Sequence, residues 1–500
     1  MIWWLKKVLL PWVSCKAHPI FFVWLIIMPA VGLQAQTEEE IFDSQAKLAY
    51  QELFRLKLPH ASSLIEQNTP INEPVWAYLK HLNLTLNVLI TENEKLTDLL
   101  YDEHKNLLKI VTNLPSDNPW RGFFENEMKI QLAFVKLKRG ESFSGGNQLR
   151  SAYSGLKKNQ ASFPQFWPHY KSFGILQILL STVPDQFQWI LKLLGMDASA
   201  EEGLRNLKDK AINSELFRDE SETMYSLIQI FLLEEYEVGE TALRKKYEQD
   251  KENVLLAYLL STSYLRNNEG AKAEKVLNEV KPTFKFTFLE YQRANIQLQK
   301  GNYSQAETLF LKFLTEREGD NYLKDSWYKL YLTALLSGNQ AKATQYLARA
   351  KSEGTVNVEP DKNAERELEE GDINVILKKS RLATDGGFYD IALQTLANSQ
   401  ASDFPSKKDK IEKQYRLARI YDLTGEDEKA LSLYKEVISQ TNGETWYFAP
   451  NSALMAGNIL KIKKQFQAAK AMYEKALSYK SHAYKNSIDT KAKAGLASIH

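Results

Sequence analysis

The chain has 500 residues, of which 44% are hydrophobic and 25% are charged. These proportions are typical of a globular protein and exclude a disordered, a collagenous or a polytopic membrane protein. With 64 basic and 62 acidic residues, the formal net charge is only +2, so there is no general electrostatic reason to expect binding to nucleic acid or anionic lipid.

The first 35 residues are typical of a secretory signal peptide. Lys6, Lys7 and Lys16 form a basic start, and the apolar run Ile20–Leu33 is followed by small and polar residues. Pro29 interrupts the run, which is also shorter than the roughly 20 residues that span a membrane. We therefore predict that residues 1–35 are removed after export. The alternative is an uncleaved signal anchor, which would be the chain's only attachment to a membrane.

The only cysteine, Cys15, lies inside this leader and precedes its apolar run. A lipoprotein signal carries its cysteine after the apolar run, so lipidation is not expected. The exported chain would contain neither a disulfide nor a thiol nucleophile.

Residues 36–250 are predicted to form diverged helical hairpins. Leu, Ala, Lys and Glu dominate beyond residue 36, and apolar residues recur at steps of three and four, the helical period. The alternative is a separate helical domain that packs against the C-terminal half. The aromatic residues Phe166, Tyr170 and Phe173 have helical spacing, which favours a buried interface over a ligand platform.

An internal repeat occupies residues 251–480. In the repeat, a helix ends in Gly or Asn (in every copy but the last), and after a short turn an Ala opens the next helix, with a large residue four positions later. GEDEKALSLY at 425–434 is one copy. Two helices approach closely only where small side chains meet. The repeated alanines, spaced by 33, 37, 49, 38 and 39 residues, are Ala273, Ala306, Ala343, Ala392, Ala430 and Ala469.

At these residues the chain resembles the tetratricopeptide repeat (TPR) family, whose period is 34. In the best copy, the residues in register are Leu417, Ala418, Tyr421, Gly425, Ala430, Tyr434 and Val437. The resemblance implies an all-α fold, an α-solenoid of antiparallel helix hairpins forming a TPR-like superhelix. Residues 251–480 would be the TPR array and 481–500 a C-terminal capping helix, as a solenoid requires for solubility. The widest repeat spacing contains the polar stretch 352–372, which we interpret as a loop.

Sequence motifs for catalysis are missing. No two of the histidines beyond residue 36 lie within ten residues of each other, so no local metal-ligand spacing exists. The chain also has no phosphate-binding loop and no GxSxG elbow. We therefore predict that the protein is not an enzyme and needs no cofactor or metal.

The TPR resemblance also implies which residues face the concave groove, because the first helix of each repeat lines it. At the fifth helix position stand tyrosines, which either contact a partner or pack between hairpins. The groove candidates are Tyr258, Tyr291, Tyr328 and Tyr415, with Asn295, Arg419, Asp422, Asn458 and Lys461 at later positions. We also predict a solvent-facing aromatic recognition loop at Trp446, Tyr447 and Phe448, between Gly443 and Pro450.

Together these features predict a non-catalytic protein–protein interaction scaffold that binds a segment of another protein in its groove. The run Leu33–Gln36 (LQAQ) resembles the signal ends of exported Bacteroidetes proteins, which implies a periplasmic or outer-membrane-associated location in a Gram-negative envelope. The alternatives are a glycan or small-ligand binding protein built on TPR hairpins and an outer-membrane assembly accessory factor.

Overall fold

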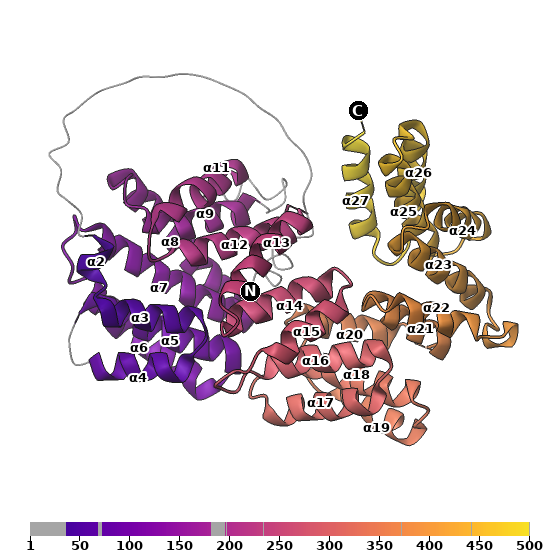
Figure 1. The fold of residues 1–500 in the computed structure, drawn as a ribbon, viewed down its shortest axis with the longest axis horizontal. Helices are drawn as coiled ribbons and strands as arrows, with labels where there is room; N and C mark the ends of the chain where they lie inside the picture. Colours follow the sequence, from indigo (N-terminus) through magenta and orange to yellow (C-terminus); the bar gives the residue numbers. More distant parts are fainter. Residues whose placement is uncertain are drawn as a thin grey trace.

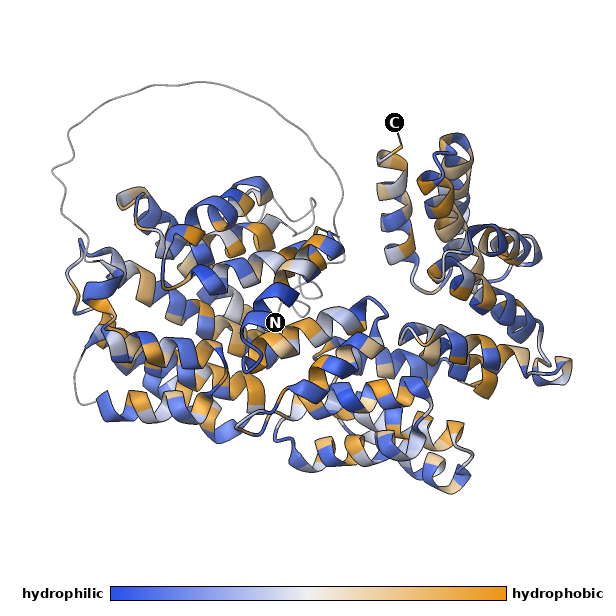
Figure 2. Ribbon diagram, viewed as in Figure 1, coloured by the Kyte–Doolittle hydropathy of each residue, from blue (hydrophilic) through white to orange (hydrophobic). Residues whose placement is uncertain are grey.

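The computed structural model describes residues 37–68, 73–181, 196, 198–233, 235–371, 373–441 and 443–499. The predicted signal peptide lies outside the described residues. Within them, every regular element is a helix (Figure 1). Apolar and polar residues alternate along these helices (Figure 2), as expected where each helix buries one stripe. None of the described helices combines the length and the apolar character needed to cross a membrane.

The N-terminal half is a cluster of paired helices that lie side by side (Figure 1). The pairs include α3 with α4, α5 with α6, α7 with α8, and α12 with α13. The helices are α2 (Glu38–Ile41), α3 (Ser44–Phe54), α4 (Leu58–Asn68), α5 (Pro74–Thr91), α6 (Glu94–Val111), α7 (Pro119–Lys138), α8 (Ser142–Ser162), α9 (Pro168–Ser181), α11 (Ala200–Arg205), α12 (Arg218–Phe231) and α13 (Tyr236–Gln249), with a π-helical turn at Asn206–Lys210 and a 3-10 turn at Ala211–Asn213.

An aromatic core joins the first and the last of these N-terminal helices. The ring centroids of Tyr50, on α3, and Phe217, just before α12, are only 4.9 Å apart. Other fully buried rings in this core include Phe42, Trp120 and Phe123. The same core continues into the helices that follow residue 250. The predicted burial of Phe166, Tyr170 and Phe173 is confirmed, since none is more than 8% exposed.

The C-terminal half is a solenoid of antiparallel helix hairpins, which curves from α14 to α27 in Figure 1. Its helices are α14 (Val254–Arg266), α15 (Gly270–Glu279), α16 (Thr287–Lys300), α17 (Tyr303–Glu316), α18 (Leu323–Leu336), α19 (Gln340–Ser352), α20 (Glu359–Glu369), α21 (Val375–Asp385), α22 (Tyr389–Ala397), α23 (Lys407–Leu423), α24 (Asp427–Gln440), α25 (Phe448–Ile462), α26 (Phe466–Ser478) and α27 (Lys485–Ala497), with a 3-10 turn at Ala401–Asp403. Helix α27 packs on α25 and α26.

Small residues stand where the paired helices cross. All six repeated alanines are at most 1% exposed, as the repeat predicts. At the α25–α26 crossing, a Cβ added to Gly457 would lie 2.7 Å from the ring of Tyr473. The turn between α16 and α17 depends on Gly301, whose φ of 82° suits glycine. Close packing at these small residues therefore determines how near the two helices of a hairpin lie to each other.

The interpretation of 352–372 as a loop is wrong, because this stretch contains helix α20. The stretch is strongly polar, but Pro360 stands in the first turn of the helix, where a missing N–H costs nothing. One face of the helix is buried through Asp361 and Ala364. Helix α20 packs on α18, so it is an extra helix between two hairpins.

Asp361 holds α20 against the start of α18. Its two carboxylate oxygens accept hydrogen bonds from the backbone N–H groups of Tyr322 (2.8 Å) and Asp325 (2.9 Å). The side chain is fully buried. Burial raises its pKa to about 7; the two backbone hydrogen bonds oppose this shift and the nearby carboxylate of Asp325 adds to it.

Adjacent alanines on α26 offer a matched test of the hairpin packing. Ala469 is fully buried, and its neighbour Ala468 is exposed. We expect Ala469→Trp to overfill the helix contact and lower the free energy of unfolding by about 1–3 kcal/mol. Ala468→Trp should change it by less than about 0.5 kcal/mol. Urea unfolding measures both, and equal effects of the two substitutions would contradict this packing.

The raised pKa of Asp361 predicts a pH-dependent stability. Between pH 4 and 7 the folded chain keeps a proton on Asp361 that the unfolded chain releases. This group therefore stabilises the fold most at the acidic end of that window, and its contribution declines as the pH rises, with a slope of up to about 1.4 kcal/mol per pH unit. Asp361→Asn cannot titrate and should remove this component.

The measurement is the free energy of unfolding from pH 4.5 to 7.5, taken as the difference between the wild type and Asp361→Asn, because other groups also titrate. Asp320→Asn, at an exposed aspartate, is the control and should leave the slope unchanged. A constant difference between the wild type and Asp361→Asn would show that Asp361 does not titrate in this range.

Candidate protein-interaction groove

The predicted groove tyrosines are mostly buried. Tyr291, Tyr328 and Tyr415 are 9%, 5% and 3% exposed, and Tyr258 is half-buried with its ring centroid 5.1 Å from that of Phe286. The Tyr291 hydroxyl donates to Asp325 Oδ2 at 2.5 Å. Burial leaves little of these rings for a partner, so they pack between helices, the second of the two interpretations.

The predicted polar groove residues bond to other parts of the chain. Asp422 accepts hydrogen bonds from Arg419 (3.0 Å) and from the hydroxyl of Tyr434 (2.8 Å). The other bonds run from Asn295 Nδ2 to the Tyr291 carbonyl (2.7 Å), from the Tyr473 hydroxyl to Asn458 Oδ1 (2.8 Å) and from Lys461 Nζ to Ser498 Oγ (2.9 Å). Asp422, Asn458 and Lys461 thereby link neighbouring helices, whereas the bond of Asn295 stays within α16.

The predicted solvent-facing aromatic loop is wrong for Phe448, whereas Trp446 and Tyr447 do lie in the loop before α25. Phe448 is 2% exposed, starts α25 and packs against Tyr415 with ring centroids 5.3 Å apart. Trp446 and Tyr447 are half-buried. The nearby Pro450 falls in the first turn of a helix, a position that tolerates proline, so it does not mark a loop here.

Helix α20 packs on the face of α18 that carries Tyr328, a predicted groove residue. The hydroxyl of Tyr328 donates to Glu367 of α20 at 2.9 Å. Lys324, on α18, forms an ion pair with Glu365 at 3.0 Å. Together with the bonds of Asp361, these contacts hold α20 against α18.

Glu367 is the centre of a buried ionic cluster between α18, α20 and α21. It lies 2.5 Å from Lys378 Nζ and 2.8 Å from Arg381 Nη1. Burial alone would raise the pKa of Glu367, but the two cations and the Tyr328 hydroxyl outweigh burial and lower it to about 2. Burial and the neighbouring Arg381 lower the pKa of Lys378. Positive charge is therefore crowded at this point.

Next to this cluster lies a partly exposed patch that we call the Arg–Tyr face, made of Arg381, Tyr447 and Tyr484 together with the buried Arg416, which is 8% exposed. The Arg416 guanidinium donates to the Tyr447 hydroxyl at 3.0 Å, and the rings of Tyr447 and Tyr484 meet edge to face at 5.2 Å. Tyr484 is 37% exposed, and the Arg381 side chain is 26% exposed. The Arg366 guanidinium lies 5.7 Å from the Tyr484 ring, so α20 borders this face.

Reasoning from the sequence identified Tyr447 but missed Arg381, Arg416 and Tyr484. Arg381 and Arg416 fall outside the groove positions of the repeat, and Tyr484 lies just after the array, at the start of α27. The sequence carries no signal that would bring these residues together.

The described part of the chain contains no group of three or more His, Cys, Asp or Glu side chains that could hold a metal ion. Its chemistry at the Arg–Tyr face is that of cations and phenol rings, which are common at the centre of protein interfaces.

Comparisons with curated proteins and solved structures give only distant similarity. No curated protein matches the chain. One solved structure that resembles it is the APC/C hetero-tetramer Cut9–Hcn1, with 13% sequence identity, coverage of 92% of this chain and 97% of that chain, and a TM-score of 0.28. Another is a human IFIT1 dimer with PPP-AAAA, with 16% identity, coverage of 75% of this chain and 94% of that chain, and a TM-score of 0.29. The TPR domain of P58(IPK) also matches, with 15% identity, coverage of 84% of this chain and 98% of that chain, and a TM-score of 0.20. TM-scores this low support no inference about ligands.

Family models assign the repeats themselves. Two models described as tetratricopeptide repeat match residues 415–445 and 450–482. These ranges contain the hairpins α23–α24 and α25–α26, with Ala430 and Ala469 at their crossings. Residues 415–482 of the chain therefore match the tetratricopeptide repeat in two consecutive segments.

Proposed function

We propose that this protein is a non-catalytic protein–protein interaction scaffold of the bacterial cell envelope, exported by the signal at residues 1–35. The observation that supports this function best is the stack of tetratricopeptide hairpins from α23 to α26, which together with α21 and the start of α27 presents the partly exposed Arg–Tyr face. Stacked hairpins suit such a role because each adds its own increment of binding surface.

The partner segment would bind at the Arg–Tyr face rather than along the whole groove. Helix α20 already lies on α18 and forms ion pairs with Lys324 and Lys378. Arginine and tyrosine are enriched among the residues that contribute most to binding energy at interfaces. Tyr484, with its ring at the edge of the face, is the most accessible aromatic residue there.

The test is cross-linking of the tagged full-length protein in native envelopes, followed by affinity purification and mass spectrometry. We expect one stoichiometric protein partner and an exported chain that has lost residues 1–35. Tyr484→Ala should reduce recovery of the partner by about fivefold or more, as expected when an interface aromatic is lost. This substitution breaks none of the buried ion pairs of Glu367.

Lys245→Glu, at an exposed position of α13, is the matched control and should leave recovery unchanged. Purification of the wild type without a partner would contradict the scaffold. Equal recovery with Tyr484→Ala would place the partner elsewhere on the protein.

A further inference from the structure

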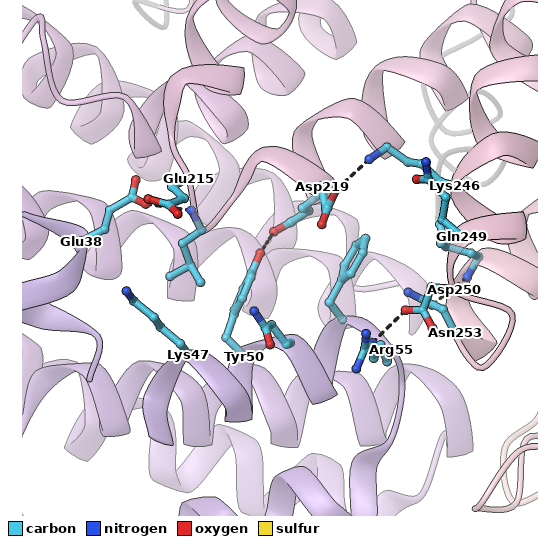
Figure 3. A pocket seen from close by; sticks show the side chains of 15 residues that line it. Glu38, Lys47, Tyr50, Arg55, Glu215, Asp219, Lys246, Gln249, Asp250 and Asn253 are labelled. Atoms are coloured by element: carbon cyan, nitrogen blue, oxygen red, sulfur yellow. Dashed lines mark hydrogen bonds and ion pairs between the residues drawn. The ribbon is translucent and has the colours of Figure 1, made fainter. Parts of the chain in front are cut away.

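A second site lies in the N-terminal half, away from the Arg–Tyr face. A cleft of about 340 Å³ separates α3 from the start of α12 and the end of α13 (Figure 3). Helix α3 forms one wall with Lys47, Tyr50, Gln51, Phe54 and Arg55. The opposite wall is formed by Glu215, Leu216, Asp219, Glu220, Lys246, Gln249, Asp250, Asn253 and Leu256, with Glu38 at one end.

Hydrogen bonds that cross the cleft fix the distance between its two walls. Arg55 Nε donates to Asp250 Oδ2 at 2.8 Å, and the Tyr50 hydroxyl donates to Glu220 (Figure 3). At the end of the cleft, Glu38 accepts hydrogen bonds from Ser214 Oγ (2.6 Å) and from the Leu216 N–H (2.8 Å). The cleft is therefore formed before any ligand arrives, which lowers the cost of binding.

The buried Lys171 is the cation nearest to the cleft residue Glu220 outside the lining itself. Lys171 is 2% exposed and forms ion pairs with Glu127 at 2.9 Å and with Glu220 at 3.1 Å. Both are charge-assisted hydrogen bonds, so the charge of Lys171 is already balanced and is not offered to a ligand.

Carboxylates outnumber cations in the cleft, by five to three. Each of the three cations is already paired: Lys47 with Glu39 (3.6 Å), Arg55 with Asp250, and Lys246 with both Asp219 (2.8 Å) and Glu222 (2.7 Å). Glu215 has no ion pair within the described part of the chain. In Figure 3 its carboxylate lies beside that of Glu38 at the open end of the cleft.

The remaining lining residues suit an organic cation. A cleft with an excess of one charge focuses the field on a ligand of the opposite sign. The rings of Tyr50 and Phe54 line the same space, and aromatic faces attract ammonium and guanidinium groups. Gln51 and Gln249, both exposed, lie on opposite walls and can hydrogen-bond to the rest of the ligand.

We propose that this cleft binds a small organic cation, a compound with a primary ammonium or guanidinium group whose charge is held by Glu215. The cation is either a free amine or the end of a basic side chain from another protein. This binding site is independent of the proposed scaffold function, because it uses none of the residues of the Arg–Tyr face.

The test uses agmatine, which carries an ammonium and a guanidinium group, with glutarate as an anion of similar length. Titration calorimetry on the exported chain should give saturable agmatine binding with a dissociation constant of about 1 mM or tighter, weakened by added salt. Glutarate should not bind. A capped tripeptide with a single arginine distinguishes the two sources: binding as tight as that of agmatine indicates a partner's side chain, and no binding indicates a free amine.

Substitution of Glu215 locates the site. Glu215→Gln should weaken agmatine binding by about fivefold, the loss expected for one partly exposed ion pair. Its melting temperature should match the wild type, because Glu215 is exposed. Glu237→Gln, at an exposed position of α13, should bind normally, and so should Tyr484→Ala, which separates this test from that of the scaffold. Absence of agmatine binding, or binding unaffected by Glu215→Gln, would overturn the proposal.

Discussion

The close approach of two helices at a small side chain is the constraint on which the C-terminal half depends. Where α25 crosses α26, a single added methyl group at Gly457 would collide with the ring of Tyr473. The same crossing places Ala469 out of contact with water, and Tyr473 fills the space beside it. Because each hairpin is closed in this way, it offers its neighbours an apolar face, and stacking of these faces builds the solenoid.

The N-terminal half also has helices that cross at small residues, such as Gly174 and Gly239, and it adds a core of large aromatic side chains. Tyr50 and Phe217, 167 positions apart in the chain, meet in its core. Tyr50 also carries a hydroxyl that reaches Glu220, and Glu220 in turn binds the buried Lys171. One residue thus belongs both to the apolar core and to the wall of the cleft. The charged cleft is a consequence of how the first helices pack on α12 and α13.

The sequence predicts the helices and the crossings of the C-terminal half well, because both follow from local spacing. Ala430 and Ala469 stand at fixed intervals, and their burial needs no knowledge of distant contacts. Helix α20 was not predicted, because its formation depends on contacts with residues that are distant in the sequence. Its composition is that of a polar loop, and what orders it is a set of bonds to other helices, such as that of Glu367 to Tyr328.

The groove residues show the same limit. A repeat position predicts that Tyr291 or Tyr415 points toward the groove, but it does not predict whether another helix already covers that position. The run Trp446–Phe448 lies beside Pro450, and this proximity predicts an exposed loop. The contact of the Phe448 ring with Tyr415, which the sequence does not indicate, shows that the ring is buried. Tyr484 and Arg381 come together across a hundred residues of chain, which no local pattern can indicate.

The inserted helix has a consequence for how the repeats can be used. Helix α20 gives carboxylates to the N–H groups at the start of α18 through Asp361, and to the cations of α21 through Glu367. Through Glu367 it neutralises the positive charges of Lys378 and Arg381 on α21. Arg381, bonded to Glu367 on one side and partly exposed on the other, is where this neutralisation ends. The proposed partner segment would therefore contact the side chains next to α20 that are still partly exposed, which are Arg381, Tyr447 and Tyr484.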